Sequence, residues 1–468
     1  MKKKTIVILV VLLVVVLACG AYLFNIYYFK DYTSSADNEN TILVDNETKT
    51  LSKVSVNKTG DGENENADFS GTNAAILAQN GSKLTLKNSK VATEGRYANA
   101  VFSYDDNTVI DISNTEITTK GQYSGGIMVT GGGTLNAKNV KVETFGDSAA
   151  AIRSDRGGGT MNVEGGTFNT NGLGSPVIYS TANIKVSDAK LEAKESEAVV
   201  IERGNTVNLE KVDITGNNEV LNSDAKVNTN IMLYHSMSDN STAYSEFTAN
   251  DSKIESKTGT MFYVTNTTAK INLKNDELIL DKNNKLLTIE KGPWGKEGSN
   301  GGKVVLSINS QNLEGDISVD EDSALNFIIS KDSTYTGKIE AKNKTYVKLS
   351  NGAKWTLTGD SSISSLTCSD GAIDLNGHKL LVNGKEYTGG DSKGKSIEIA
   401  YSTSLDGEEP IGTERTKDGG EADGDGKDDN PPGSPDEVKG DNPPEPPKDK
   451  DGRPEPPPDG YKHGEKSN

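Results

Sequence analysis

The chain repeats itself over residues 73–219, and this repeat constrains the fold more than any other feature of the sequence. Three phrases, LTLKNSKVATEG, IDISNTEITTKG and LNAKNVKVETFG, start 26 and then 25 residues apart, and MNVEGGTFNTNG follows after 26 more. Two shorter copies follow at spacings of 23 residues. The six copies begin at Leu84, Ile110, Leu135, Met161, Ile184 and Val207. A fixed period of this length is typical of a solenoid, in which each repeat stacks on the one before it.

Apolar residues alternate inside each copy, as Leu84 and Leu86 do in the first, and this indicates a strand with one buried face. A second apolar position, Val91 in the first copy, recurs after a turn that contains Asn, Asp or Gly. A third apolar cluster, residues 74–76 in the first coil, completes each coil, and no helical periodicity appears after residue 30. The sequence therefore predicts an all-β chain, a parallel β-helix with three short strands and three turns per coil.

One turn of the repeat carries an asparagine, at Asn88, Asn114 and Asn139. Asparagine tolerates a left-handed backbone, and identical side chains stacked at the spacing of strands form a ladder. We expect these three residues to form a structural ladder and not a ligand site.

The coils resemble those of right-handed parallel β-helix surface proteins of Gram-positive bacteria, a group often described as adhesin-like. The resemblance covers about residues 67–402, and the phrases MFYVTNTTAKINL, GPWGKEGSNGG and WTLTGD carry its more specific part. It implies a right-handed coil, in agreement with the general handedness of parallel crossovers, and a place on the cell surface. The fold also resembles that of pectate lyases and polygalacturonases, which act on acidic polysaccharides.

Composition excludes several classes of function. The formal net charge of −18 argues against a basic groove that binds nucleic acid. The two cysteines, Cys19 and Cys368, are far apart, and the three histidines are scattered, so neither a structural disulfide nor a Cys/His metal cluster is expected.

The first 30 residues predict a membrane anchor. Three lysines precede an apolar run over residues 5–29, which is long enough to span a bilayer, and such charges stay on the inner side. We expect a single-pass segment with the N-terminus inside and the rest of the chain on the extracellular face of a bacterial membrane. Two alternatives stay open: a cleaved signal peptide of a secreted protein, and a lipoprotein leader acylated at Cys19, because residues 16–19 resemble a lipobox.

Three further segments follow this anchor. Residues 31–66 are polar and are interpreted as a linker and N-terminal cap, since the end of a solenoid needs shielding. Residues 67–402 are assigned to the β-helix. Residues 403–468 hold twelve of the 14 prolines and many acidic residues, which predicts a disordered, partly polyproline II tail.

Charged turn residues are the candidates for a ligand site. Asp105 and Asp106 follow the third strand of one coil, and Asp155 and Arg156 follow the equivalent strand about two coils later. Because these turns stack, they could hold a cation such as Ca²⁺ or an acidic sugar; exposed charges that keep the protein soluble are the simpler interpretation. The polygalacturonase-like pattern pairs two aspartates with a nearby His-Gly, which is missing here, so we expect no catalysis and no cofactor.

Four tyrosines on the flank of the coils allow two interpretations. Such rings can stack on sugars, or they can pack within turns, and we favour packing. The residues are Tyr97, Tyr104, Tyr123 and Tyr179.

These observations predict a non-catalytic adhesin or structural rod on the cell surface that binds an extracellular polysaccharide or another surface ligand. The alternative is a carbohydrate-binding module, or a lyase or hydrolase, that acts on an acidic polysaccharide such as pectin. An enzyme or a calcium-dependent lectin would lose activity when Asp105, Asp106 or Asp155 is replaced, whereas a rod would tolerate the change.

Overall fold

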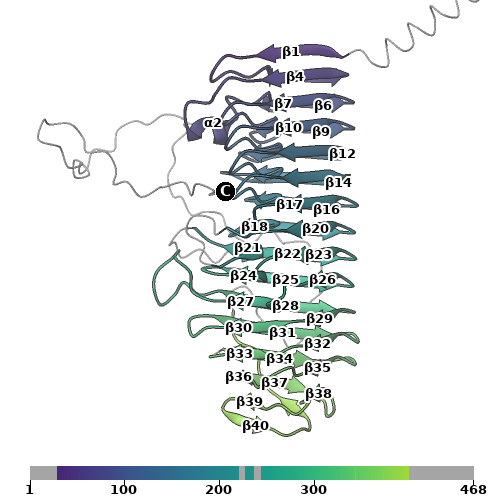
Figure 1. The fold of residues 1–468 in the computed structure, drawn as a ribbon, viewed down its shortest axis with the longest axis vertical. Coiled ribbons are helices and arrows are strands. Elements are labelled where there is room, and N and C mark those ends of the chain that lie inside the picture. The colour runs from purple at the N-terminus through teal and green to yellow at the C-terminus, as the bar shows by residue number, and fades with distance from the viewer. Residues whose placement is uncertain (1–28, 221–226, 237–243, 343, 400–468) are drawn as a thin grey trace, which may run out of the picture. The chain divides into compact units, whose positions relative to one another are not determined.

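The computed structural model describes residues 29–220, 227–236, 244–342 and 344–399. These residues form stacked coils, and each coil contributes one strand to each of three faces, which we name the first, second and third face in chain order (Figure 1). All strand pairs between successive coils are parallel until the C-terminal cap. The predicted all-β solenoid with three strands per coil is thus confirmed.

The first face is the flank on which the repeat phrases begin. Its strands are β3 (Thr48–Ser52), β6 (Lys83–Lys87), β9 (Val109–Ser113), β12 (Gly133–Thr144), β14 (Gly159–Thr170), β16 (Asn183–Ser187), β19 (Thr206–Glu210), β22 (Tyr244–Asn250), β25 (Thr268–Lys274), β28 (Lys303–Asn309), β31 (Ala324–Ser330), β34 (Thr345–Leu349) and β37 (Ser365–Cys368).

The second face is continuous with the first in one 22-stranded sheet, because the long strands β12 and β14 run through both. Its other strands in that sheet are β1 (Lys30–Ser34), β4 (Val54–Lys58), β7 (Lys90–Thr93), β10 (Glu116–Thr119), β17 (Lys190–Ala193), β20 (Asp213–Gly216), β23 (Lys253–Ser256) and β26 (Glu277–Ile279). A separate four-stranded sheet continues the face with β29 (Asn312–Glu314), β32 (Thr334–Thr336), β35 (Lys354–Thr356) and β38 (Ile373–Asp374).

The third face is one 15-stranded sheet. Its strands are β2 (Ile42–Asp45), β5 (Ile76–Gln79), β8 (Val101–Tyr104), β11 (Ile127–Thr130), β13 (Ile152–Ser154), β15 (Ile178–Ser180), β18 (Val199–Glu202), β21 (Thr229–Tyr234), β24 (Thr260–Val264), β27 (Lys285–Ile289), β30 (Asp316–Val319), β33 (Ile339–Ala341), β36 (Ser361–Ile363), β39 (Leu380–Val382) and β40 (Lys385–Tyr387). The final pair, β39 with β40, is antiparallel and begins the C-terminal cap.

The register of the strands follows the sequence repeat. Leu84 pairs with Ile110, and the ladder continues through the first residue of every later copy. Val91 pairs with Ile117 in the same way on the second face. These side chains point inward and are almost fully buried in one continuous apolar core. A shift by one residue would expose this whole set, which is why the pattern determines the register so strongly.

The predicted asparagine turn has the expected conformation. Asn88, Asn114 and Asn139 have φ values of 47°, 48° and 52°, and the side-chain Nδ2 of Asn114 donates to Asn88 Oδ1 at 3.4 Å. The same left-handed conformation occurs one coil earlier, where Lys53 has a φ of 53°. Strands β3 and β4 lie on either side of it.

The coils begin earlier than the boundary drawn from the sequence. Apart from Lys30 at the start of β1, strands β1 to β4 lie within the segment interpreted as a linker and cap, and they pair with β4 to β7 as later coils do. One short helix, α2 (Glu65–Ser70), interrupts the coil before β5 and was not expected from the sequence. It packs on the third face, since Thr130 Oγ1 donates to the carbonyl oxygen of Phe69 at 2.8 Å.

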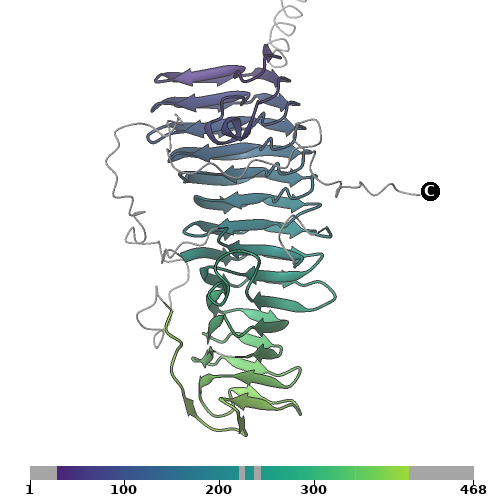
Figure 2. The same ribbon diagram turned by 90° about the vertical axis from the view of Figure 1, so that its left-hand side faces the viewer.

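The C-terminal end of the stack is closed by antiparallel pairs. After β40 the chain forms β41 (Ser392–Lys393), which pairs with β37, and it then returns along the first face, as Figure 2 shows in yellow-green. Within the described ranges no helix is long and apolar enough to cross a membrane. The predicted anchor up to residue 28, Cys19 and the predicted tail over residues 403–468 lie outside the described residues.

Candidate ligand-binding groove

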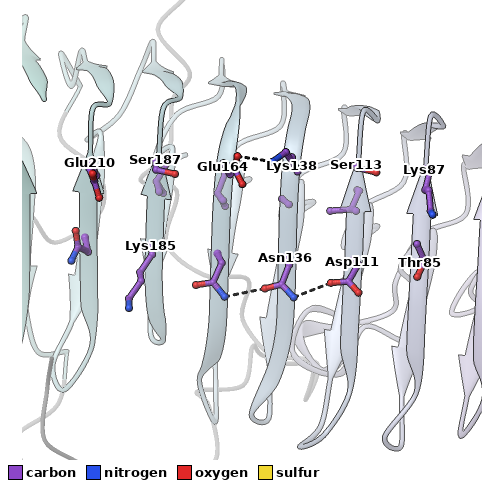
Figure 3. A pocket seen from close by; sticks show the side chains of 16 residues that line it. Thr85, Lys87, Asp111, Ser113, Asn136, Lys138, Glu164, Lys185, Ser187 and Glu210 are labelled. Atoms are coloured by element: carbon purple, nitrogen blue, oxygen red, sulfur yellow. Dashed lines mark hydrogen bonds and ion pairs between the residues drawn. The ribbon is translucent and has the colours of Figure 1, made fainter. Parts of the chain in front are cut away.

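A polar groove crosses six coils of the first face, over β6, β9, β12, β14, β16 and β19, with a volume of about 760 Å³ (Figure 3). Two rows of outward-facing side chains line it, one residue from each strand in each row. The first row is Thr85, Asp111, Asn136, Asn162, Lys185 and Asn208. The second row is Lys87, Ser113, Lys138, Glu164, Ser187 and Glu210.

The repeat itself builds both rows. In each phrase the first and third residues enter the core, so the second and fourth must point outward on the same strand. In the phrase LNAK, for example, Leu135 and Ala137 are buried, while Asn136 and Lys138 face the groove. Successive coils are ~4.8 Å apart, which is the usual spacing of neighbouring strands in the direction of their hydrogen bonds. The groove therefore presents polar groups at a regular axial spacing.

Hydrogen bonds along the rows hold several of these side chains in place. Asn136 Nδ2 donates to Asp111 Oδ1 at 2.9 Å, and Asn162 Nδ2 donates to Asn136 Oδ1 at 2.9 Å (Figure 3). In the second row Lys138 Nζ lies 2.6 Å from Glu164 Oε1, with more than half of each side chain exposed. Exposed pairs of this kind add little stability.

The charge of the groove is balanced although the whole chain is acidic. Three lysines, Lys87, Lys138 and Lys185, line it together with three carboxylates. Among the described residues no aromatic side chain lines it. The arrangement suits hydrogen bonding to a string of hydroxyl or amide groups better than it suits stacking or the attraction of one sign of charge.

The residues expected to form an acidic site are not in this groove. Asp105 and Asp106 follow β8, and Asp155 and Arg156 follow β13, two strands further along the third face. The intervening coil places Gly131 and Gly132 between the two turns, and Gly131 donates its backbone N–H to the carbonyl oxygen of Arg156 at 3.0 Å. Among the residues that the structure describes, no group of three or more His, Cys, Asp or Glu side chains could hold a metal ion.

Two members of the predicted acidic site, Asp155 and Arg156, have partners on the same side of the stack. Asp155 Oδ2 accepts a hydrogen bond from Arg153 at 3.2 Å, and the Arg156 guanidinium lies 3.8 Å from the centre of the Phe69 ring. Burial, together with the nearby charges of Asp106 and Asp45, raises the pKa of Asp105. The binding of calcium or of an acidic sugar at these turns stays a prediction.

The four flank tyrosines pack against protein. Tyr97 is 6 % exposed and stacks on Tyr123 with ring centres 4.9 Å apart, and Arg96 lies over both rings. Tyr104 is half-buried beside an apolar cluster of the third face, and Tyr179 is half-buried in another. The surroundings of these rings match the packing interpretation.

Two sets of residues were missed by the sequence reasoning. The groove residues carry a signal, because polar positions alternate with the apolar ones in every phrase. Asp68 carries no such signal in the sequence. It lies on the unexpected helix α2 and accepts two hydrogen bonds from Arg153.

No protein-family model matches the sequence, and a search of curated proteins finds none that is similar to it. The structure alone therefore defines the class: an all-β, β-helix-like solenoid of stacked parallel strands with a polar groove along one face.

Proposed function

We propose that this protein is a non-catalytic surface rod, a right-handed parallel β-helix of the adhesin-like kind, that binds an extended polysaccharide along the first-face groove. The observation that carries the proposal is the pair of polar rows that runs through six successive coils. A polysaccharide is itself a repeating ligand, and a ladder of donors and acceptors at constant spacing can bind several of its units at once.

The cell-surface location belongs to the same proposal. It rests on the apolar run over residues 5–29 with lysines before it, which would place the coils outside a bacterial membrane with the N-terminus inside. A rod anchored at its N-terminal end would hold its coils outside the membrane, in reach of the polymers of a cell wall or of a neighbouring surface.

A glycan array tests the proposal with the purified full chain and two matched variants. Asn162→Trp fills the groove from an exposed position of β14, whereas Asn169→Trp places the same ring on the second face of the same strand. We expect binding to at least one neutral polysaccharide, a loss of about tenfold or more with Asn162→Trp, and no change with Asn169→Trp.

Some outcomes of the same array would contradict the proposal. Equal losses in both tryptophan variants, or no glycan binding by the full chain, would remove the groove as a polysaccharide site. New reducing ends or unsaturated sugars in the bound fraction would show an enzyme. Running each arm with and without calcium shows whether a cation takes part, and the Asp105→Ala variant then reports on the acidic turn.

A further inference from the structure

Each strand of the groove carries one charged side chain, and the sign of that charge alternates from coil to coil. The order from β6 to β19 is Lys87, Asp111, Lys138, Glu164, Lys185 and Glu210. All six residues are exposed. The groove therefore presents positive and negative charges in alternation at an axial spacing of ~4.8 Å.

Contacts within one chain account for only part of this pattern. Lys138 pairs with Glu164, and Asp111 accepts a hydrogen bond from Asn136. Lys87 and Lys185 form no ion pair with another residue that the structure describes. Their place in the alternation is therefore not explained by the folding of a single copy.

The two rows of the groove share a symmetry in their order. At equal distances from the two ends of a row, a charged residue matches one of opposite charge and an uncharged residue matches an uncharged one. The matches in the second row are Lys87 with Glu210, Ser113 with Ser187, and Lys138 with Glu164. Those in the first row are Thr85 with Asn208, Asp111 with Lys185, and Asn136 with Asn162. Such a surface is complementary to its own copy in reverse order.

We propose that two copies of this chain pack groove to groove as an antiparallel dimer. Its twofold axis lies between β12 and β14 and runs along the strands. The axis reverses the order of the coils and places each row opposite the same row of the second copy. Lys87 then faces Glu210, Asp111 faces Lys185 and Lys138 faces Glu164 across the interface, and the axis makes each of these contacts twice.

The dimensions of the stack permit these pairs between copies but not all of them within one copy. Sheets that pack face to face lie ~10 Å apart, a distance that a lysine and a carboxylate side chain span together. Within one chain, Asp111 and Lys185 are three coils apart, or ~14 Å. A direct contact between these two side chains therefore reports on the second copy.

The charges select one register and one direction for the dimer. A slip by one coil brings either Lys138 or Glu164 opposite the same residue of the second copy, so like charges meet. Parallel packing about an axis along the stack would place each charge opposite an uncharged residue of the other row. Only the antiparallel order without a slip pairs all six charges.

The outward side chains around the groove are compatible with the same arrangement. In the row that begins each of the six strands the only charge is Lys83, and it would face Thr206. The next coil at either end, β3 and β22, continues the two groove rows with uncharged residues only. These residues are Thr50 and Ser52, opposite Thr248 and Asn250.

The dimer is expected to be weak and sensitive to salt, because exposed polar side chains build it. Its antiparallel order points the N-terminal ends of the two copies in opposite directions. This suits chains on two facing surfaces, where many weak contacts act together. The dimer covers both grooves, so a second copy and a glycan would exclude each other, but the dimer does not depend on the proposed glycan binding.

Sedimentation equilibrium of the full chain in a neutral detergent tests the dimer in the absence of glycan. We expect a dimer at ~0.05 M salt whose dissociation constant rises about tenfold or more at ~0.5 M salt. Asp111→Lys places two lysines opposite each other and should weaken the dimer about tenfold or more. Adding Lys185→Asp should restore it, because the exchanged charges again meet their opposites. Glu116→Lys makes the same change in the same coil on the second face and should shift the constant by less than about threefold.

Three outcomes of this measurement would overturn the proposal. They are a monomer at every concentration in low salt, equal dissociation constants for Asp111→Lys and Glu116→Lys, and no recovery when Lys185→Asp is added. None of them bears on polysaccharide binding, which the glycan array measures separately.

Crosslinking with a short bismaleimide checks the direction of the dimer, in a Cys19→Ser background in which Cys368 is buried. Thr85→Cys combined with Asn208→Cys should give a covalent dimer, because the two positions face each other across the axis. Thr85→Cys alone should give none, since its two copies lie at opposite ends of the interface, ~24 Å apart along the stack. A covalent dimer of the single variant, or none of the double variant, would contradict the antiparallel order.

Discussion

Arg153 and Asp68 form a buried two-pronged ion pair between residues 85 positions apart in the sequence. Arg153 Nη1 and Nη2 donate to the two carboxylate oxygens at 2.8 and 2.6 Å, and Asn99 Nδ2 donates to Asp68 at 3.1 Å. Burial raises the pKa of Asp68, and Arg153 opposes that effect. Burial alone would lower the pKa of Arg153, but Asp68 and Asp155 outweigh it and the pKa is raised. The pair fastens helix α2 to the outside of the third face.

Removal of one partner should be costly because it leaves the other charge buried alone. We expect Asp68→Ala to lower the free energy of unfolding by about 3–5 kcal/mol, and the double variant Asp68→Leu with Arg153→Met to recover most of that loss. Chemical denaturation measures both. Lys120→Ala, which breaks an exposed pair with Glu94 at 2.7 Å, is the control and should cost less than about 1 kcal/mol. Similar losses from Asp68→Ala and Lys120→Ala would contradict the assignment.

The core could be predicted from the sequence because the alternation of apolar and polar residues in each strand shows which face is buried. Leu84, Ile110 and Val91 occupy the registers that the repeat indicated. The Asp68–Arg153 pair could not be predicted from the sequence. A six-residue helix has no periodicity to detect, and the contact joins different coils. The outward alternation of Asn136 and Lys138 was visible. That their row is hollowed into a groove depends on the shape of the sheet, which alternation does not reveal.

A column of glycines lets successive coils approach closely at one corner. A Cβ on Gly146 would lie 1.9 Å from the carbonyl oxygen of Gly121, and one on Gly121 would lie 1.8 Å from that of Gly95. Gly146→Ala should therefore lower the free energy of unfolding by about 2–3 kcal/mol, because backbone cannot move aside as a side chain can. Gly359→Ala is the control, since its nearest neighbour is the flexible Lys338 Cδ at 3.1 Å. A tolerated Gly146→Ala would mean that the coils are not stacked this tightly.

The left-handed turn at Lys53 offers a stabilising substitution. Lys53 occupies the position that Asn88 holds in the next coil, and both have positive φ, 53° and 47°. Lys53→Asn should raise the midpoint of thermal unfolding, with a gain of about 0.5–1 kcal/mol, because asparagine adopts this backbone at lower cost. The same change at Lys190, an exposed residue within β17, should give no gain. Equal effects at both positions would count against the argument from φ.

Asp276 makes stability depend on pH. Burial raises its pKa to about 7; the backbone N–H groups of Ser252 and Lys274 donate to it and oppose the shift, and Asp251 adds to it. The native protein thus holds this proton more tightly than the unfolded chain, in which aspartate titrates near pH ~3.9. The stabilising contribution is complete below that pH and is lost as the pH rises toward 7.

The test compares the unfolding free energy of the wild type and Asp276→Asn at pH 5 and pH 8. The wild type should lose about 2 kcal/mol relative to the variant over this interval, since Asn does not titrate. Asp106→Ala removes an exposed carboxylate, and its unfolding free energy should change between the two pH values as that of the wild type does. A constant difference between wild type and Asp276→Asn would show that the buried carboxyl does not take up a proton in this range.

The balanced charge of the groove predicts how its proposed glycan binding responds to salt. Lys87, Lys138 and Lys185 face an equal number of carboxylates, so the lining of the groove carries no net charge for salt to screen. The affinity for a neutral polysaccharide should change by less than about threefold between ~0.05 and ~0.5 M salt. Glu164→Gln with Glu210→Gln leaves two uncompensated positive charges, so this variant should gain affinity for acidic polysaccharides, and salt should abolish that gain. Steep salt dependence in the wild type, or its preference for acidic glycans, would place the ligand elsewhere on the surface.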